Sequence, residues 1–275
     1  MSQTNQAARP QQRGSPDFDA LAGRALHLVA RSGDGRERGP RPEARGSDIL
    51  HRLVAAVCEA DPGHRDVVMA EMSAAGISPE EIIDSYIPGA ARLLGEAWCE
   101  DRASFTDVTI GVARLQGLLR ELGDRRGDAL SDAQGSFDSP RIMVIVRQDS
   151  FHTLGALVAG AQLRRMGLSV RMVIGESDSE ITMLARTRDF DMIMLSAAGC
   201  EDLALLEKLV KKIRVACSEA TPIVLGGPIL EAGPIAKTSI GVDFTTNDPC
   251  EALRLCGLRV PQAAAAVEAH VQGSF

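Results

Sequence analysis

The sequence predicts an α/β protein in which a doubly wound, parallel five-stranded sheet is preceded by an all-α helical bundle. Two observations predict this class. Short apolar runs alternate with helical patterns from residue 141 to residue 260, whereas residues 47–124 carry helical patterns alone. The Gly-, Asp- and Ser-bearing stretch 125–140 separates the two regions and is expected to be an interdomain linker.

In the carboxyl-terminal region, short apolar runs are bounded by polar residues and glycine, as buried parallel strands are. The expected strands are 142–146, 170–174, 191–195, 222–226 and a weaker 242–246. The expected helices between them are 153–166, 178–188, 201–218 and roughly 229–238. Such alternation implies right-handed crossovers and one sheet with helices on both faces.

The helical region has clear start and stop signals. The expected helices run from Ser47 to about Ala60, from His64 to Ala75, from Ser78 to Trp98, and from Ser104 or Thr106 to Leu122. Asp61-Pro62-Gly63 is interpreted as the end of the first helix. Ser78-Pro79-Glu80-Glu81 is a capping box, and Pro88-Gly89 predicts a kink or interruption. Short links favour an antiparallel bundle.

The two ends of the chain differ from this core. Residues 1–46 are rich in Gly, Pro, Arg and Gln, which favours disorder, and their charge is 8 − 5 = +3. Apolar residues at helical spacing within Pro16–Arg31 predict a short amphipathic helix, which either docks on its own protein or binds a partner. Residues 261–275 are expected to form a last helix and tail.

Composition excludes several functions. The net charge of −7, the absence of a long Lys/Arg tract and 3% aromatic residues argue against an autonomous nucleic-acid-binding domain. No apolar run is long enough to span a bilayer, and no signal-peptide pattern opens the chain. Six cysteines without a C-x-x-C pair are typical of a reduced, cytoplasmic protein.

The residues that carry chemistry follow the predicted strands, where ligands bind in such sheets. No G-x-G-x-x-G or phosphate-binding loop is present. Instead His152 and Gly155 follow the first strand, Ser196 follows the third, and Gly226-Gly227 follows the fourth. Each has an ordinary alternative: His152 as a loop residue, Ser196 as a helix cap, and the glycines as a turn.

The spacing of these residues resembles the cobalamin-binding domain of methionine synthase, corrinoid methyltransfer proteins and cobalamin-dependent regulators. That family carries Asp-x-His-x-x-Gly, then Ser-x-Leu after about 40 residues, then Gly-Gly within a further 30. Here His152-Thr153-Leu154-Gly155 is followed by Ser196-Ala197-Ala198 and by Gly226-Gly227. A preceding helical bundle is also a feature of the family, in which it covers the other face of the corrin.

The resemblance implies that cobalamin is bound with its own base displaced. His152 would then be the lower cobalt ligand, for which a neutral imidazole is well suited. Gly155 would leave room for the displaced nucleotide tail, Ser196 would hydrogen-bond that tail, and Gly226-Gly227 would let the backbone approach it. Where the family has Asp two residues before the histidine, this chain has Ser150, so Asp149 or Ser150 would orient the ring.

The helical region indicates which cobalamin-binding family the chain resembles most. Gly95 to Trp98 gives the Gly-x-x-Trp of cobalamin photoreceptor caps, in which Trp98 would stack over the corrin, although core packing is the alternative. Those caps carry Glu-His where this chain has Val108-Thr109. The resemblance is to AerR/PpaA proteins, which are cobalamin-binding regulators of photosynthesis genes in purple bacteria. It extends through residues 47–260 and includes SFTDVTIGVARLQ, the sequence around FHTLG and an Arg-rich start, which is expected to be disordered.

That family resemblance implies a non-enzymatic antirepressor, which acts on a CrtJ/PpsR-type repressor and responds to light or to the state of the cofactor. Two other functions stay open from the sequence. One is a corrinoid carrier that passes methyl groups between methyltransferases, and the other is an α/β interaction module without a cofactor.

Overall fold

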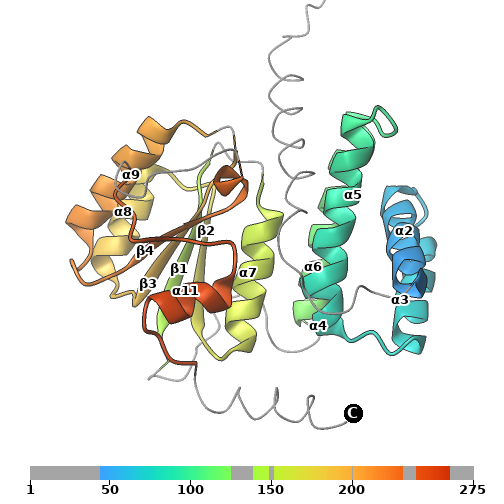
Figure 1. Ribbon diagram of the computed structural model, residues 1–275, viewed down its shortest axis with the longest axis horizontal. Helices are drawn as coiled ribbons and strands as arrows, with labels where there is room; N and C mark the ends of the chain where they lie inside the picture. The colour runs from blue at the N-terminus through green and yellow to red at the C-terminus, as the bar shows by residue number, and fades with distance from the viewer. Residues whose placement is uncertain (1–43, 125–138, 149–151, 200, 232–239, 261–275) are drawn as a thin grey trace, which may run out of the picture.

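The fold class is confirmed by the structure, a computed structural model that describes residues 44–124, 139–148, 152–199, 201–231 and 240–260. A helical bundle is followed by a five-stranded parallel sheet with helices on both of its faces (Figure 1). The predicted helices within 1–46 and 261–275 lie outside the described residues.

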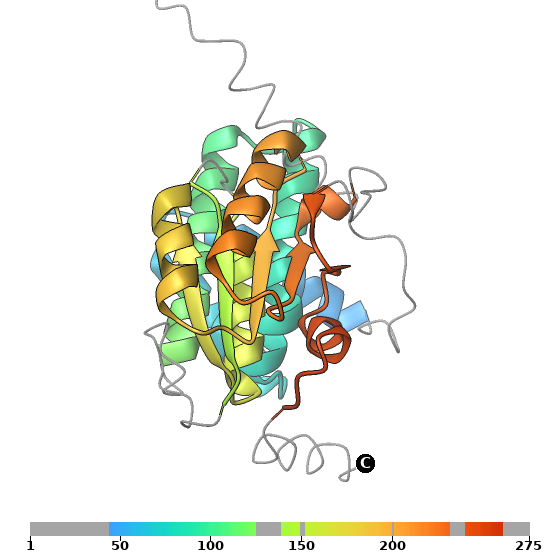
Figure 2. The same ribbon diagram turned by 90° about the vertical axis from the view of Figure 1, so that its left-hand side faces the viewer.

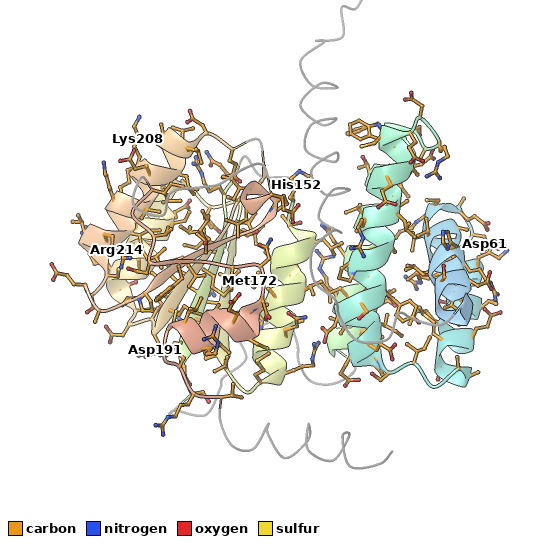
Figure 3. All side chains as sticks on the ribbon, viewed as in Figure 1. Asp61, His152, Met172, Asp191, Lys208 and Arg214 are labelled. Atoms are coloured by element: carbon orange, nitrogen blue, oxygen red, sulfur yellow. The ribbon has the colours of Figure 1, made fainter. Side chains whose placement is uncertain are left out.

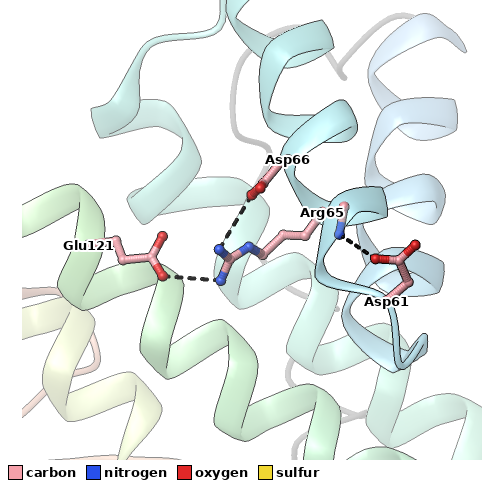
Figure 4. A network of polar contacts seen from close by, with 5 residues as sticks. Asp61, Arg65, Asp66 and Glu121 are labelled. Atoms are coloured by element: carbon pink, nitrogen blue, oxygen red, sulfur yellow. Dashed lines mark hydrogen bonds and ion pairs between the residues drawn. The ribbon is translucent and has the colours of Figure 1, made fainter.

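The bundle consists of α2 (Ala44–Cys58), α3 (Pro62–Ala74), α4 (Pro79–Glu81), the π-helix η1 (Ile82–Tyr86), α5 (Ile87–Cys99) and α6 (Phe105–Asp124). Its core contains fully buried side chains from four helices, among them Leu53, Met72, Leu94 and Leu115. On its surface, the guanidinium of Arg65 on α3 pairs with Glu121 on α6 at 3.1 Å (Figure 4).

Two expectations about helix boundaries were wrong. Asp61-Pro62-Gly63 does not end a helix but begins α3: Asp61 caps it by accepting from the Gly63 N–H at 2.9 Å, and Pro62 occupies its first turn. Proline is tolerated there because its missing N–H would have no helical partner anyway.

The interruption expected at Pro88-Gly89 lies one turn earlier. The Ile87 N–H bonds the carbonyl of Ile82, five residues back, and the helix then continues without a break through Pro88. Pro88 cannot donate to the carbonyl of residue 84 and its ring would clash there, so we attribute the wider π-turn to this proline.

The sheet contains β1 (Arg141–Val146), β2 (Ser169–Ile174), β3 (Met192–Ser196), β4 (Ile223–Gly226) and β5 (Phe244–Thr245) in the order β2-β1-β3-β4-β5. All neighbouring pairs are parallel. The helices are α7 (Leu154–Arg165), α8 (Asp178–Thr187), α9 (Leu203–Ala216) and α11 (Pro249–Leu255), with a 3₁₀ turn at Pro228–Leu230.

Among the residues that the structure describes, helices lie on both faces of the sheet, as in other doubly wound folds. Helices α8 and α9 lie in front of the sheet in Figure 2 and pack on one face, whereas α7 and α11 pack on the other. Helix α11 was not predicted, and most of the helix expected at 229–238 lies outside the described residues. No helix in the described part of the chain is long and apolar enough to cross a membrane.

Helix α7 joins the sheet to the bundle (Figure 1). Leu154, Leu157 and Val158 are buried in the same apolar cluster as the bundle core. Near the other end of α7, Arg165 forms an ion pair with Asp84 in the π-helix. The bundle therefore packs directly against the helix that follows His152.

Candidate cobalamin site

The strand ends bring together residues that are far apart in the sequence. Val146, Ser196 and Gly226 lie opposite one another, at the carboxyl ends of β1, β3 and β4. The order of strands reverses between β1 and β3, and ligands bind outside the carboxyl ends of strands at such a switch point. His152 lies after β1 at this edge, where α7 begins (Figure 3).

His152 has the protonation state that metal binding requires. Its side chain is half-buried, and burial lowers the pKa of the imidazole because a charged ring loses hydration. The ring is therefore neutral at neutral pH and keeps a lone pair for a metal. Asp149 and Ser150, which were expected to orient the ring, lie outside the described residues.

Gly155, in the first turn of α7, lies beside open space. A Cβ placed on Gly155 would meet no atom within 4 Å. Gly160, one and a half turns further along, differs, because its Cβ would lie 2.7 Å from the Met172 sulfur. Gly160 thus packs closely on the sheet, whereas Gly155 is exposed, with open space beside it near the edge where His152 lies.

Ser196 is the last residue of β3 and is half-buried. The alternative that it caps the following helix is wrong: α9 is capped by Asp202, whose carboxylate accepts from the Ala204 N–H at 2.8 Å. Ser196 therefore does not cap α9. It lies beside Gly226, at the carboxyl edge of the sheet.

The glycine pair is required by the protein's own backbone. Gly227 has φ +98°, and a Cβ there would lie 2.4 Å from the Ala197 carbonyl oxygen. A Cβ on Gly226 would lie 2.8 Å from the Thr246 carbonyl oxygen. Substituting either residue would therefore distort the loops after β3 and β5 whether or not a ligand is bound.

The bundle projects beyond the strand ends on the side of His152. Gln116 of α6 donates from Nε2 to the Thr153 hydroxyl at 2.8 Å, next to His152. Eleven residues of α6 precede Gln116. They form about 16 Å of helix that extends past the contact between Gln116 and Thr153. The carboxyl end of α5, which carries Trp98, lies at the same end of the molecule (Figures 1 and 3).

Trp98 contacts the apolar core of the bundle and remains half-buried, so its packing role is present in the structure. At the positions that carry Glu-His in the photoreceptor caps, Val108 is buried in that core. Thr109 is exposed, and its hydroxyl donates to the Phe105 carbonyl at 2.8 Å.

Sequence reasoning missed two residues of this region. Nothing in the spacing pointed to Gln116, whose partner Thr153 is distant in the chain. Asn247 accepts from the Gly227 N–H at 2.6 Å and thereby fixes the glycine turn. It follows β5, so the rule that polar residues after strands share one edge would have found it.

Comparison with known proteins shows the family to which the chain belongs. Residues 140–254 match the family model of the B12 binding domain. The uncharacterized 20.5 kDa protein in the bchF-crtJ intergenic region of Rhodobacter capsulatus is 34% identical over 183 residues, which are 66% of this chain and 94% of that protein. The chain belongs to the AerR/PpaA family. Cobalamin is the cofactor of its B12-binding domain.

The fold of this AerR/PpaA-family chain also resembles that of a solved corrinoid protein. The monomethylamine corrinoid protein of Methanosarcina barkeri superimposes with a TM-score of 0.56 at 14% identity, over 76% of this chain and 97% of that one. At this identity the likeness shows a shared fold and nothing about substrates.

The residues at the strand edge fit cobalamin. The neutral imidazole of His152 is a suitable nitrogen ligand for cobalt, and the exposed Gly155 presents no side chain that would obstruct a ligand beside it. A ligand at this edge would lie beside Gln116 and Thr153, which connect the sheet to the bundle.

Proposed function

We propose that this AerR/PpaA-family protein is a cobalamin-dependent transcriptional regulator and not an enzyme. It acts as an antirepressor on a CrtJ/PpsR-type repressor of photosynthesis genes. The observation that carries the proposal is its 34% identity to a protein encoded between bchF and crtJ. Genes that lie side by side often act in one process. The neighbouring gene crtJ shares its name with the CrtJ-type repressor proposed as the partner.

The chain's own residues would hold the cofactor and pass on its state. His152 would bind cobalt from below, Asp149 or Ser150 would orient the imidazole, and Ser196 would hydrogen-bond the nucleotide tail. Bound cobalamin would supply a cobalt centre that responds to light or to oxidation. Any movement of His152 would reach α6 through the adjacent Thr153–Gln116 hydrogen bond, which supports a regulatory role for the bundle.

The experiment that tests this proposal measures repressor occupancy on DNA. Fluorescence anisotropy of a labelled operator bound by the repressor is followed while the protein is added, with and without cobalamin, in light and in darkness. We expect the protein to release the operator and the cofactor to change the concentration required. Occupancy that stays unchanged under all four conditions would refute the antirepressor role. Cobalamin-dependent methyl transfer with a methyltransferase would indicate a corrinoid carrier instead.

Deleting residues 1–46 should weaken or alter repressor binding while cobalamin binding stays intact. The apolar stripe within Pro16–Arg31 is unnecessary for a purely solubilising tail, so we expect it to contact the partner. Cobalamin binding to the truncated protein is measured by absorption after desalting, and repressor binding by calorimetry. Equal repressor affinity with and without the tail would exclude the partner-helix role, and loss of cobalamin binding would show that the tail packs on the bundle.

A further inference from the structure

Lysine is concentrated on one helix of this protein. Of the 30 basic side chains, only four are lysines, which leaves 30 − 4 = 26 arginines. Three of the four, Lys208, Lys211 and Lys212, lie within one turn and a half of α9, and all three are exposed. An arginine-rich chain thus places three of its four flexible ammonium groups on one helix.

Two exposed apolar side chains share the surface of these lysines. Leu205 is 42% exposed and Val215 is 85% exposed. At 100° per residue, both lie within about one third of the helix circumference together with the lysines. The opposite side of α9 is buried on the sheet through Leu206, Leu209, Val210 and Ile213. We call the exposed side, Leu205, Lys208, Lys211, Lys212 and Val215, the α9 outer face.

The α9 outer face ends at a hollow. A depression of about 580 Å³ begins at Val215 and is lined by Arg214, Val215, Cys217, Glu219, Gly241 and Asp243. One wall of the hollow is held by polar contacts: Arg214 pairs with Asp243 and also donates to the Thr221 carbonyl at 2.8 Å. Asp243 precedes β5, so the hollow lies at the amino edge of the sheet, away from His152 (Figure 3).

The lysines are available to a partner despite their local ion pairs. Lys211 contacts Glu207 at 2.6 Å and Lys212 contacts Asp178 at 3.0 Å, but both ammonium-bearing side chains are more than half exposed. Exposed ion pairs of this kind contribute little, so a stronger acidic surface can replace them. Val215, exposed beside the hollow, adds an apolar contact to this charged surface.

We propose that the α9 outer face and its hollow form a docking site for an acidic, partly apolar surface of another protein. A second copy of the chain fits poorly, because a two-fold contact would place the lysines of one copy against those of the other. Nucleic acid also fits poorly, because phosphates gain nothing from exposed Leu205 and Val215. The partner's name rests on the proposed function, under which it is the repressor.

The test compares two variants with matched controls. Val215→Asp places a like charge against the acidic partner and removes the apolar contact, and Lys208→Glu/Lys211→Glu reverses the charge. The controls are Val67→Asp, at an equally apolar and 53% exposed site on α3, and Arg254→Glu, at an exposed cation of α11. Repressor affinity is measured by calorimetry at low and at high salt, and cobalamin binding by absorption.

We expect both α9 variants to weaken repressor binding by about tenfold or more, with the charge reversal losing its effect at high salt. The controls should bind within about twofold of the unaltered protein, and all four should bind cobalamin normally. Repressor affinity unchanged in both α9 variants would overturn the docking site while leaving the proposed function intact. Absence of binding by the unaltered protein would refute the proposed function and the named partner with it.

Two further measurements test whether the α9 outer face instead binds a second copy of the chain or DNA. Sedimentation velocity of the unaltered protein and Val215→Asp detects self-association, and a labelled DNA duplex without the repressor detects direct DNA binding. A dimer that dissociates in the Val215→Asp variant, or DNA binding lost in the lysine variant, would overturn the proposal. Monomers without DNA affinity in all variants support it.

Discussion

Replacing His152 by alanine should abolish the retention of cobalamin. The substitution removes the nitrogen proposed to bind cobalt, and burial already keeps that nitrogen unprotonated at neutral pH. Losing a residue that only orients a metal ligand costs about 10- to 100-fold in affinity, so we expect losing the ligand itself to cost more than about 100-fold. The measurement is the absorption spectrum after loading with hydroxocobalamin and desalting.

The controls are His51→Ala and His64→Ala, both in the bundle and both exposed. His51 contacts the Ser47 carbonyl and His64 pairs with Glu59, so neither is required at the strand edge. Free imidazole should restore the spectrum of the His152→Ala protein, because the deleted ring leaves space for it. A His152→Ala protein that keeps cobalamin with an unchanged spectrum would exclude His152 as the lower ligand.

Gly155→Leu should weaken cobalamin binding by about 5- to 140-fold, the range that overpacking a filled site by about 1–3 kcal/mol implies. A leucine side chain would extend into the open volume beside the first turn of α7, where the nucleotide tail is proposed to lie. The protein should still fold, since no atom lies within 4 Å of the added Cβ. Equilibrium titration followed by absorption measures the affinity.

Gly155→Ala is the matched control, because it keeps the helix and adds a single methyl group. It should bind cobalamin far better than Gly155→Leu and unfold no more readily than the unaltered protein, because alanine favours helix over glycine by about 1 kcal/mol. Substitutions of Gly226 or Gly227 would not test where the nucleotide tail lies, since side chains there would clash with the protein's own backbone. If Gly155→Leu bound cobalamin with full affinity, the tail would have to lie elsewhere.

The strands and most helices could be predicted because their apolar periodicity reflects burial directly. Helix α11 was missed although Asp248 caps it and Pro249 occupies its first turn. The same Asp-Pro pattern at Asp61 was interpreted as a helix end. In both places an aspartate followed by proline begins a helix, since the carboxylate satisfies free N–H groups and proline has none to satisfy.

Which residues meet at the edge of the candidate site could be predicted from the sheet topology. Parallel strands end side by side, so residues that follow separate strands meet without any local signal, as Ser196 and Gly226 do. Contacts between the two regions could not be predicted this way. The bond from Gln116 to Thr153 depends on how the bundle docks against α7, and no periodicity in either segment encodes that docking.

The boundary of the B12-binding domain in the sequence is not a boundary of the hydrophobic core. Residues 140–254 match the family model, yet Leu154, Leu157 and Val158 within that range are buried in the same cluster as the bundle. Cutting the chain at the linker would expose this stripe of α7 to water, together with the bundle surface that covers it. The cofactor domain and its cap thus share an apolar cluster, so a different bundle would need side chains that match this stripe of α7.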